Sequence, residues 1–452
     1  MSKKLPVVAI VGRANVGKSS LFNRVLQRQE AVVAREAGTT RDAVYRTVEH
    51  GAHHFWLVDT AGLKDPEDEF EATIQEQIEE AAAAADVIIV VVEAHTAITE
   101  EDRRVAKKAL KSKKPVLLIT NKVDQVAKTE SETPWERLGI KEIISTSATQ
   151  NQGISSVLDA ITDLIPPREA LPEDNVLRIA LLGRPNVGKS YLFNTLAKKQ
   201  QAVVANVAGT TRDVNKVRVR YEGRDIELLD TAGIRKSGKI EKGIEKFSVL
   251  RSLQAIEQAD VCLLLMDVNE HSTALDQKIA GLIKEAGKGL VLVVSKWDSL
   301  EKTAYTRDSI APVITHNFQF VPWAPLIFTS AETGQNVTKL FDLAMDIYAR
   351  RRAKLKTTEL NRILATSLQA HPPAGLKSRH PKPRYLVQDD VAPPTFRLYG
   401  AHLEYLHWSW KRYLEKNLRS QIDYNGTPIR FYMMNNARKS GKTKKFLPKV
   451  EE

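Results

Sequence analysis

The sequence has one cysteine and no long apolar run. Cys262 stands inside the apolar stretch 261–266, where a buried thiol is expected, and without a second cysteine no disulfide forms within the chain. No segment approaches the roughly 20 consecutive apolar residues of a membrane span. The N-terminal apolar run, about seven residues, is too short for the core of a signal peptide. We therefore expect a cytoplasmic protein with no membrane-bound part.

Positive charge is concentrated near the C-terminus. The formal net charge is +12, yet residues 348–452 hold 22 Lys and Arg against 8 Asp and Glu, whereas the preceding residues hold 45 against 47. All of the excess positive charge therefore lies in the last quarter of the chain. A polyanionic partner is one interpretation of this asymmetry and a solvated surface is the other, and charge alone does not decide between them.

Two long segments repeat each other. GRANVGKSSLFN at 12–23 returns as GRPNVGKSYLFN at 183–194, and the same offset carries AGTTRD and DTAG from one copy to the other. A repeat this long indicates a duplicated domain, because solenoid units repeat every 20 to 50 residues or so. We predict a first domain at 1–165, a proline-containing linker at 166–176 and a second domain at 177–347.

Each copy alternates short apolar runs with longer polar segments, which is typical of an α/β fold whose parallel-rich sheet is covered by helices. The strands expected in the first copy are 7–11, 55–58, 87–92, 116–120 and 142–146. Those expected in the second are 178–182, 226–229, 261–266, 290–294 and 326–329.

The remaining part of the chain does not repeat. Residues 349–370 predict a basic helical stretch, and strands are expected at 383–388, 394–400 and 428–434, with a helix at 408–422. We predict a small α+β domain at 348–437 and a basic tail at 438–452.

Both copies carry G-x-x-x-x-G-K-S between a predicted strand and a predicted helix, the context in which this motif forms a phosphate loop. The glycines let backbone amides face phosphates, the lysine reaches the β- and γ-phosphates, and the serine hydroxyl ligates magnesium. A glycine-rich turn with a chance lysine would not recur in the same context. The residues concerned are Gly12, Arg13, Ala14, Asn15, Val16, Gly17, Lys18, Ser19 and Ser20, and Gly183, Arg184, Pro185, Asn186, Val187, Gly188, Lys189, Ser190 and Tyr191. We expect Tyr191 to pack at the helix start.

A carboxylate ends a strand beyond each phosphate loop, inside DTAG. It can hold the magnesium ion through water, while the glycine amide senses the γ-phosphate, so that hydrolysis releases the following loop. The two motifs are Asp59, Thr60, Ala61 and Gly62, and Asp230, Thr231, Ala232 and Gly233. One threonine of Thr39 and Thr40, and one of Thr210 and Thr211, closes over the metal, and the sequence leaves open which.

A third motif selects the base. In Asn121-Lys122-Val123-Asp124 the carboxylate can accept both the N1 and N2 hydrogens of guanine, a donor pair that adenine lacks, so GTP and GDP are favoured over ATP. The second copy, Ser295-Lys296-Trp297-Asp298, keeps the carboxylate but not the asparagine, and we expect looser binding there. The pairs Ser147-Ala148 and Ser330-Ala331 follow the last strands and suit a backbone amide behind the base.

In this order, the motifs resemble the double-GTPase family known as Der or EngA. KFSVLR at 246–251, WKRYLEKNLR at 410–419 and GTPIR at 426–430 also fit it, so the resemblance covers essentially the whole chain. It implies a magnesium-dependent GTPase that acts in ribosome assembly, on the large ribosomal subunit or its precursors, through a KH-like C-terminal domain that binds rRNA. We expect a monomer. G-x-x-G, the usual KH loop, is missing, so Arg and Lys contacts to the RNA backbone are expected.

The residues after DTAG are apolar. Many GTPases orient the attacking water with a glutamine there, whereas this chain has Leu63 and Ile234. This resembles the GTPases in which a potassium ion, held partly by the phosphate-loop asparagine, supplies positive charge. Asn15 and Asn186 occupy that position. The alternative is that they only stabilise the loop.

Two other classes of function are alternatives to a nucleotide-dependent switch in ribosome assembly. An enzyme that modifies RNA or acts on membranes would need a further catalytic domain or a lipid anchor, and the sequence shows neither. A scaffold that retains nucleotide folds without hydrolysis would not need intact Lys, Ser and Asp positions in both copies. GTP turnover separates the scaffold from the switch protein.

Overall fold

The structure is a computed structural model that describes residues 5–30, 45–51, 53–60, 81, 85–125, 134–165, 176–199, 215–230, 249–300, 306–374 and 380–435. It divides into two compact units. One comprises Met1–Arg352 with Tyr424–Pro428, and the other comprises Ala353–Asp423 with Ile429–Glu452. None of the helices in the described part is long and apolar enough to cross a membrane.

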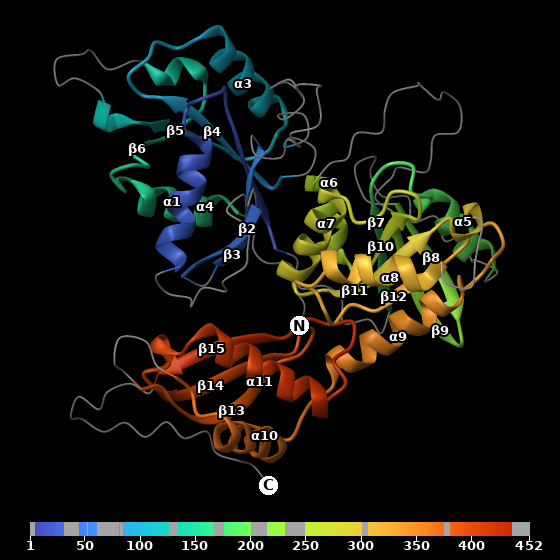
Figure 1. Ribbon diagram of the computed structural model, residues 1–452. Helices are drawn as coiled ribbons and strands as arrows, with labels where there is room; N and C mark the ends of the chain where they lie inside the picture. The colour runs from blue at the N-terminus through green and yellow to red at the C-terminus, as the bar shows by residue number, and fades with distance from the viewer. Residues whose placement is uncertain are drawn as a thin grey trace. The chain divides into compact units, whose positions relative to one another are not determined.

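The first unit begins with a domain built on a six-stranded sheet of order β2-β3-β1-β4-β5-β6 (Figure 1). All neighbours are parallel except β2 and β3. Helices α1 and α4 pack on one face of the sheet and α3 on the other. The elements are β1 Val7–Val11, α1 Lys18–Glu30, β2 Tyr45–His50, β3 His53–Asp59, β4 Val87–Glu93, α3 Glu100–Lys111, β5 Val116–Asn121, η2 Val123–Gln125, η3 Trp135–Leu138, β6 Glu142–Thr146 and α4 Ile154–Leu164.

The second domain of this unit repeats the arrangement, with the order β12-β11-β10-β7-β9-β8. Helices α5 and α9 share one face of the sheet, and α6, α7 and α8 the other. The elements are β7 Leu177–Gly183, α5 Lys189–Lys199, β8 Asn215–Tyr221, β9 Arg224–Asp230, α6 Val249–Gln258, β10 Val261–Asp267, α7 Ala274–Glu285, β11 Gly289–Ser295, η4 Trp297–Ser299, α8 Thr306–Asn317, β12 Leu326–Phe328 and α9 Lys339–Arg352.

The predicted α/β class is therefore confirmed, and each expected strand is present. Sequence reasoning missed β2 and β8, the antiparallel edge strands. Their sequences, YRTVEH and NKVRVRY, are largely polar. An edge strand that is open to solvent on one side does not need the continuous apolar run that marks a buried parallel strand.

Both domains of the first unit contribute to one apolar cluster, which runs from Val7 and Trp56 in one domain to Leu253 and Ile279 in the other. Polar contacts accompany it. The indole nitrogen of Trp56 donates to Glu257 Oε1 at 2.6 Å, and the hydroxyl of Tyr45 donates to the carbonyl oxygen of Lys278 at 2.8 Å. Strands β2 and β3 therefore pack on helices α6 and α7.

Five residues from near the C-terminus, Tyr424–Pro428, belong to the first unit. The backbone N–H of Leu290 donates to the carbonyl oxygen of Gly426 at 2.9 Å, and the N–H of Gly426 donates to that of Trp323 at 2.7 Å. Gly426 has a φ of +79°, and a Cβ there would collide with Ile347. The segment is thus fitted closely against β11 and α9.

The second unit is the predicted small α+β domain. Its sheet has the order β13-β14-β15, with β13 antiparallel and β15 parallel to β14. The predicted helical stretch 349–370 is divided, because α9 ends at Arg352 and the next helix begins at Thr357. The elements are α10 Thr357–Ala370, β13 Lys382–Asp390, β14 Thr395–Ala401, η5 Leu403–Tyr405, α11 Trp408–Gln421 and β15 Arg430–Asn435.

Candidate nucleotide-binding sites

The first phosphate loop joins β1 to α1 through a tight backbone path. Asn15 and Gly17 have positive φ values of 64° and 92°. A Cβ on Gly12 would lie 2.5 Å from the carbonyl oxygen of Val91, so only glycine fits there. The second loop repeats this path at Asn186, with a φ of 63°. The exposed members of the two loops are Ala14, Asn15, Ser19, Ser20, Asn186 and Tyr191.

Each loop lysine folds back over its own loop. The ammonium group of Lys18 donates to the carbonyl oxygen of Gly12 at 2.8 Å, and that of Lys189 donates to Gly183 at 3.0 Å. Both lysines are buried. The two copies thus hold a positive charge at the same place in the loop, where it can meet phosphate oxygens.

The first site brings its two candidate magnesium ligands together. Ser19 Oγ donates to Asp59 Oδ2 at 2.5 Å, across 40 residues of sequence. The neighbouring hydroxyl of Thr60 donates to the carbonyl oxygen of Ile10 at 2.7 Å, which fixes the end of β3 against β1. A hydroxyl and a carboxylate are hard oxygen donors of the kind that magnesium prefers, so these residues fit that ion.

Several predicted site residues lie outside the described part of the chain. They are Thr39, Thr40, Ala61, Gly62, Thr210, Thr211, Thr231, Ala232 and Gly233, and the apolar Leu63 and Ile234 lie there too. Asp230 ends β9 as expected, but its side chain is not described. Ser190 is half-buried at the start of α5.

Asn121 connects the base-reading segment with two loops. Its side-chain amide donates to the carbonyl oxygen of Val16 at 3.0 Å. Its carbonyl oxygen accepts from the backbone N–H of Ala148 and from the hydroxyl of Thr146, each at 3.2 Å. One carboxamide therefore holds the phosphate loop and the loop of Ser147 together, and the N–H of Ala148 is engaged by Asn121.

Asp124 lies exposed in η2, just after this junction. A hydrogen bond from the hydroxyl of Ser147 lowers the pKa of its carboxyl, and Thr149 adds a smaller effect in the same direction. An ionised carboxylate accepts hydrogen bonds only. The side chain predicted to read guanine is therefore kept in the form that can accept two N–H groups.

The second site joins its base-reading segment to its phosphate loop through a different side chain, Ser295. Ser295 Oγ lies 2.7 Å from the carbonyl oxygen of Val187, which corresponds to Val16, and 3.0 Å from that of Met266. The hydroxyl has one proton, so it serves one of the two at a time. Among the described residues, no hydrogen bond joins Ser295 to the backbone N–H of Ala331 in the way that Ala148 donates to Asn121. The link to the phosphate loop is kept, and the equivalent link to Ala331 is lost.

The absent carboxamide leaves room beside the second loop. A Cβ on Gly17 would collide with Asn121 Nδ2, whereas a Cβ on Gly188 would meet nothing within 4 Å. Trp297 does not fill this room, because its ring packs 4.6 Å from that of Phe328 in the core. Asp298 follows in η4 and is half-exposed.

The expectation that Tyr191 packs at the helix start is wrong. Its side chain is 55% exposed. The spacing explains the difference, because the neighbouring Leu192 and Phe193 supply the buried face of α5. Position 191 therefore points away from the sheet.

An acidic cluster behind each loop was missed by sequence reasoning. Arg13 pairs with Glu93 at 2.8 Å and with Asp102 at 3.5 Å, and Lys122 pairs with the same Glu93. Burial opposes ionisation of Glu93, but hydrogen bonds from Lys122 and Arg13 outweigh it and lower the pKa of Glu93. The guanidinium group of Arg13 is thus engaged by the two carboxylates.

The second copy builds a related cluster, in which the arginine and the lysine have different carboxylate partners. Arg184 pairs with Glu270 at 3.0 Å and with Asp276 at 3.3 Å, and Lys296 pairs with Asp267 at 2.7 Å. An acidic residue at the end of the strand after DTAG in both copies was the available signal. These ion pairs join residues more than 25 positions apart, so their partners could not be assigned from spacing.

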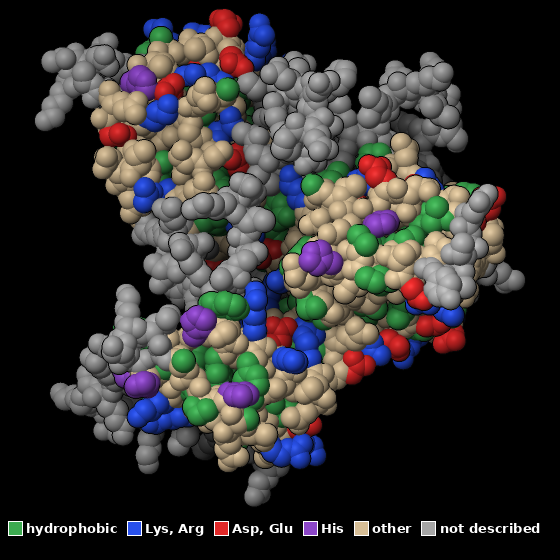
Figure 2. Space-filling model, in the orientation of Figure 1, with side chains coloured by type: hydrophobic (Ala, Val, Ile, Leu, Met, Phe, Trp, Pro, Cys, Tyr) green, Lys and Arg blue, Asp and Glu red, His purple; other side chains and the backbone are tan. Residues whose placement is uncertain are grey.

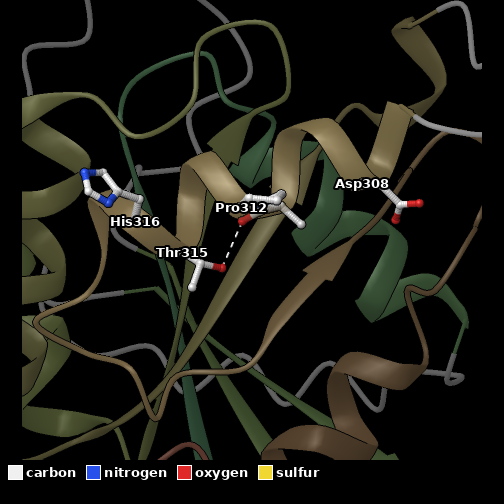
Figure 3. Close-up of a pocket in the computed structure, with 5 residues that line it drawn as sticks. Asp308, Pro312, Thr315 and His316 are labelled. Carbon is white, nitrogen blue, oxygen red and sulfur yellow. Dashed lines mark hydrogen bonds between the residues drawn. The ribbon is translucent and has the colours of Figure 1, made fainter.

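One pocket of the described part of the chain lies away from both phosphate loops. It is an open depression on α8 lined by Asp308, Ala311, Pro312, Thr315 and His316 (Figure 3). Thr315 Oγ1 donates to the carbonyl oxygen of Ala311 at 2.9 Å. It contains no phosphate-loop or base-reading residue, so it is not the nucleotide site.

Two sites with the same loop and lysine and a similar acidic cluster, each on a mostly parallel sheet, define the class of this protein as a tandem P-loop GTPase. A family model described as 50S ribosome-binding GTPase matches residues 7–122 and again 178–296. A second model, described as the KH-domain-like C-terminal domain of EngA bacterial GTPase enzymes, matches 354–433.

The chain is 43% identical over 433 residues to GTPase Der of Chloroflexus aggregans, which covers 94% of this chain and 96% of that protein. It is 42% identical to GTPase Der of Desulfitobacterium hafniense strain Y51, over 95% of this chain and 98% of that protein. The chain belongs to the Der family of GTPases. Era in complex with MgGDPNP and 16S ribosomal RNA is 21% identical, with 57% of this chain and 92% of that chain covered and a TM-score of 0.31, which adds nothing to the assignment.

Proposed function

We propose that this GTPase is a nucleotide-dependent switch in the biogenesis of the large ribosomal subunit, and that it binds rRNA or ribosomal particles. The observation that carries the proposal is the combination of two phosphate-binding loops with a C-terminal segment in which 22 Lys and Arg stand against 8 Asp and Glu. The description of the matching family as 50S ribosome-binding GTPase supports it. We also propose that the protein acts as a cytoplasmic monomer.

In the proposed reaction each site divides the work among four groups. Lys18 and Lys189 neutralise the β- and γ-phosphates, and the serine and aspartate of each copy hold magnesium. When bound, that ion offsets the charge of the phosphates. Asp124 and Asp298 select guanine over adenine. The DTAG glycines and one threonine of each pair follow the presence of the γ-phosphate, so that hydrolysis changes the loops beside β2 and β8.

Potassium stimulation is part of the proposal. Asn15 and Asn186 are exposed on their loops with φ values of 64° and 63°, which places both side chains at the loop surface in the same way. A carboxamide oxygen there could ligate a monovalent cation. Such an ion would supply the positive charge that an arginine gives in other GTPases.

RNA binding is proposed to depend on the second unit and the tail. Without a G-x-x-G loop, contacts from Arg and Lys to phosphates are the expected mode, and these release counterions.

The test is co-sedimentation of the full chain with purified large subunits in GTP, in GDP and in a non-hydrolysable GTP analogue. We expect binding that differs between GDP and the analogue. A chain with Lys18→Ala and Lys189→Ala is the matched control and should lose the difference. Equal binding under all conditions, or no turnover of GTP, would contradict the proposal.

A further inference from the structure

Helix α3 of the first domain has a cationic outer face. Its buried side is formed by Val105, Ala106 and Ala109. The side toward solvent carries five cations, which are Arg103, Arg104, Lys107, Lys108 and Lys111. In Figure 2, Lys and Arg side chains are visible over the part of the first domain where Figure 1 places α3.

Part of this face borders a groove. Helices α3 and η3 enclose about 440 Å³, lined by Arg103, Lys107, Leu110, Lys111, Arg137 and Leu138. No carboxylate is among the lining residues. Arg103 has a partner, Glu100, at 3.6 Å, but both side chains are exposed and such a pair contributes little. The groove therefore offers positive charge to a ligand.

The duplication supplies an internal comparison. Helices α3 and α7 begin with the same capping box, Thr99 with Asp102 and Thr273 with Asp276, so they are equivalent elements. Segment 99–114 holds seven Lys and Arg against three acidic residues. The equivalent segment 273–288 holds three against two, and one of its three cations is the buried Lys288. The cationic face is thus specific to the first copy.

The two helices also differ in what covers them. On α7 the outer face meets β2 of the first domain, where Tyr45 and Thr47 bond to Lys278 and Glu285. On α3 the equivalent face is exposed. The helix dipole favours cations only in the last turn, so it does not account for Arg103 and Lys107, which lie nearer the N-terminus.

We propose that the α3–η3 groove is a docking surface for the phosphate backbone of RNA, separate from the second unit and the tail. Arg103, Lys107 and Lys111 follow one another at intervals of four residues, which spaces successive charges by about 6 Å along the helix axis. Arg137 faces them across the groove. Leu110, 40% exposed, gives this surface an apolar contact for sugar or base edges. This inference rests on the proposed function, in which RNA is the partner.

The test compares two variants of the full chain that lose the same charge. One carries Arg103→Gln, Lys107→Gln and Lys111→Gln. The matched control carries Arg218→Gln, Arg220→Gln and Arg224→Gln, three exposed arginines of the β8–β9 hairpin. The probe is a fluorescein-labelled oligouridine of about 20 nucleotides, and its affinity is measured at several salt concentrations.

We expect the groove variant to bind the probe about tenfold more weakly, with the slope of log affinity against log salt reduced by about 2 units, since each phosphate contact contributes roughly 0.7. The control should keep the wild-type slope, and GTP turnover without RNA should be unchanged in both. Replacing Lys107 and Lys111 by arginine should retain binding.

Three results would overturn the inference. A groove variant whose slope equals that of the wild type or the control shows that the groove does not contact RNA. Loss of binding to labelled polyglutamate with unchanged RNA binding shows that the partner is an acidic protein. If the wild type binds no RNA even at low salt, the proposed function is contradicted as well. If the wild type binds RNA and the groove variant behaves like the wild type, the groove proposal alone fails.

Discussion

The side-chain amide of Asn121 donates to the backbone carbonyl oxygen of Val16, so a residue of the base-reading motif fastens the first phosphate loop. The second site fastens its loop with a shorter side chain, through Ser295 and Val187. The two sites of one chain thus differ in the hydrogen bonds that join the base-reading segment to the phosphate loop.

The first prediction is that Ser295→Asn tightens GDP binding at the second site. The space beside Gly188 can accept the larger side chain, and the carboxamide oxygen can accept from Ala331 as Asn121 accepts from Ala148. One added bond of about 1 kcal/mol corresponds to roughly fivefold in affinity. The measurement is a GDP titration in an Asp124→Asn background, which silences the first site.

The reciprocal change supplies the control. Asn121→Ser in an Asp298→Asn background should weaken the first site by a similar factor. If both substitutions leave affinity unchanged, and the two sites already bind GDP alike, the proposed asymmetry is wrong.

The second prediction concerns the loop glycines. Gly17 and Gly188 share a φ of 92°, so replacement by alanine strains both backbones equally. Only at Gly17 does the new methyl group also meet Asn121. We expect Gly17→Ala to cost about 1 to 3 kcal/mol more in GDP binding than Gly188→Ala. The double variant Gly17→Ala with Asn121→Ser should recover part of the difference, and a double-mutant cycle measures it.

The third prediction is that turnover is faster in potassium than in sodium at equal ionic strength. The effect should disappear at the first site with Asn15→Ala, measured in an Asp298→Asn background that silences the second site. It should disappear at the second site with Asn186→Ala, measured in an Asp124→Asn background that silences the first site. Magnesium is kept constant. Equal rates in both salts would count against a monovalent cation at either asparagine.

The fourth prediction concerns the tail, which lies outside the described residues. Deleting 438–449 removes six Lys and Arg. We expect the salt slope for RNA binding to fall by up to about 4 units, at roughly 0.7 for each contact. A control of equal length with these six residues replaced by glutamine separates charge from chain length, and an unchanged slope would identify the tail as a solvated end.

The fifth prediction uses the single thiol. Burial in β10 raises the pKa of Cys262 to about 12. Alkylation by N-ethylmaleimide needs the thiolate, so in the native state it should be slow and remain slow from pH 7 to about pH 9. In denaturant the rate should rise with pH toward the ordinary thiol pKa near 8.5. A fast native reaction would show that β10 opens readily.

Most of the fold could be predicted from the sequence because the buried strands are continuous apolar runs. Val87–Glu93 and Val261–Asp267 are apolar almost throughout, since both faces of their sheets are covered. Asn215–Tyr221 carries three cations, and its pairing with β9 depends on contacts distant in the sequence. Local pattern therefore located the parallel strands of each sheet, including the edge strands β6 and β12, but not the antiparallel edge strands β2 and β8.

For the candidate site too, some residues could be predicted from the sequence and others could not. Lys18, which we propose to contact phosphate through its ammonium group, belongs to a fixed sequence motif and could be identified from it. Glu93 and Asp102 support Arg13 from other elements. An acid at the end of the strand after DTAG recurs in both copies, but nothing in the sequence assigns Arg13 as its partner. Tyr191 was misplaced because a bulky side chain beside a motif suggests packing, whereas the helical phase decides it.

Segment Tyr424–Pro428 has a consequence for domain dissection. The chain leaves the first unit after Arg352, re-enters it at Tyr424 and leaves again after Pro428. A fragment that stops at Arg352 would expose the N–H of Leu290 and the carbonyl oxygen of Trp323, both now bonded to Gly426. The second GTPase domain is therefore completed by residues translated more than 70 positions after its last helix, so on the ribosome it cannot finish folding until nearly the whole chain has emerged.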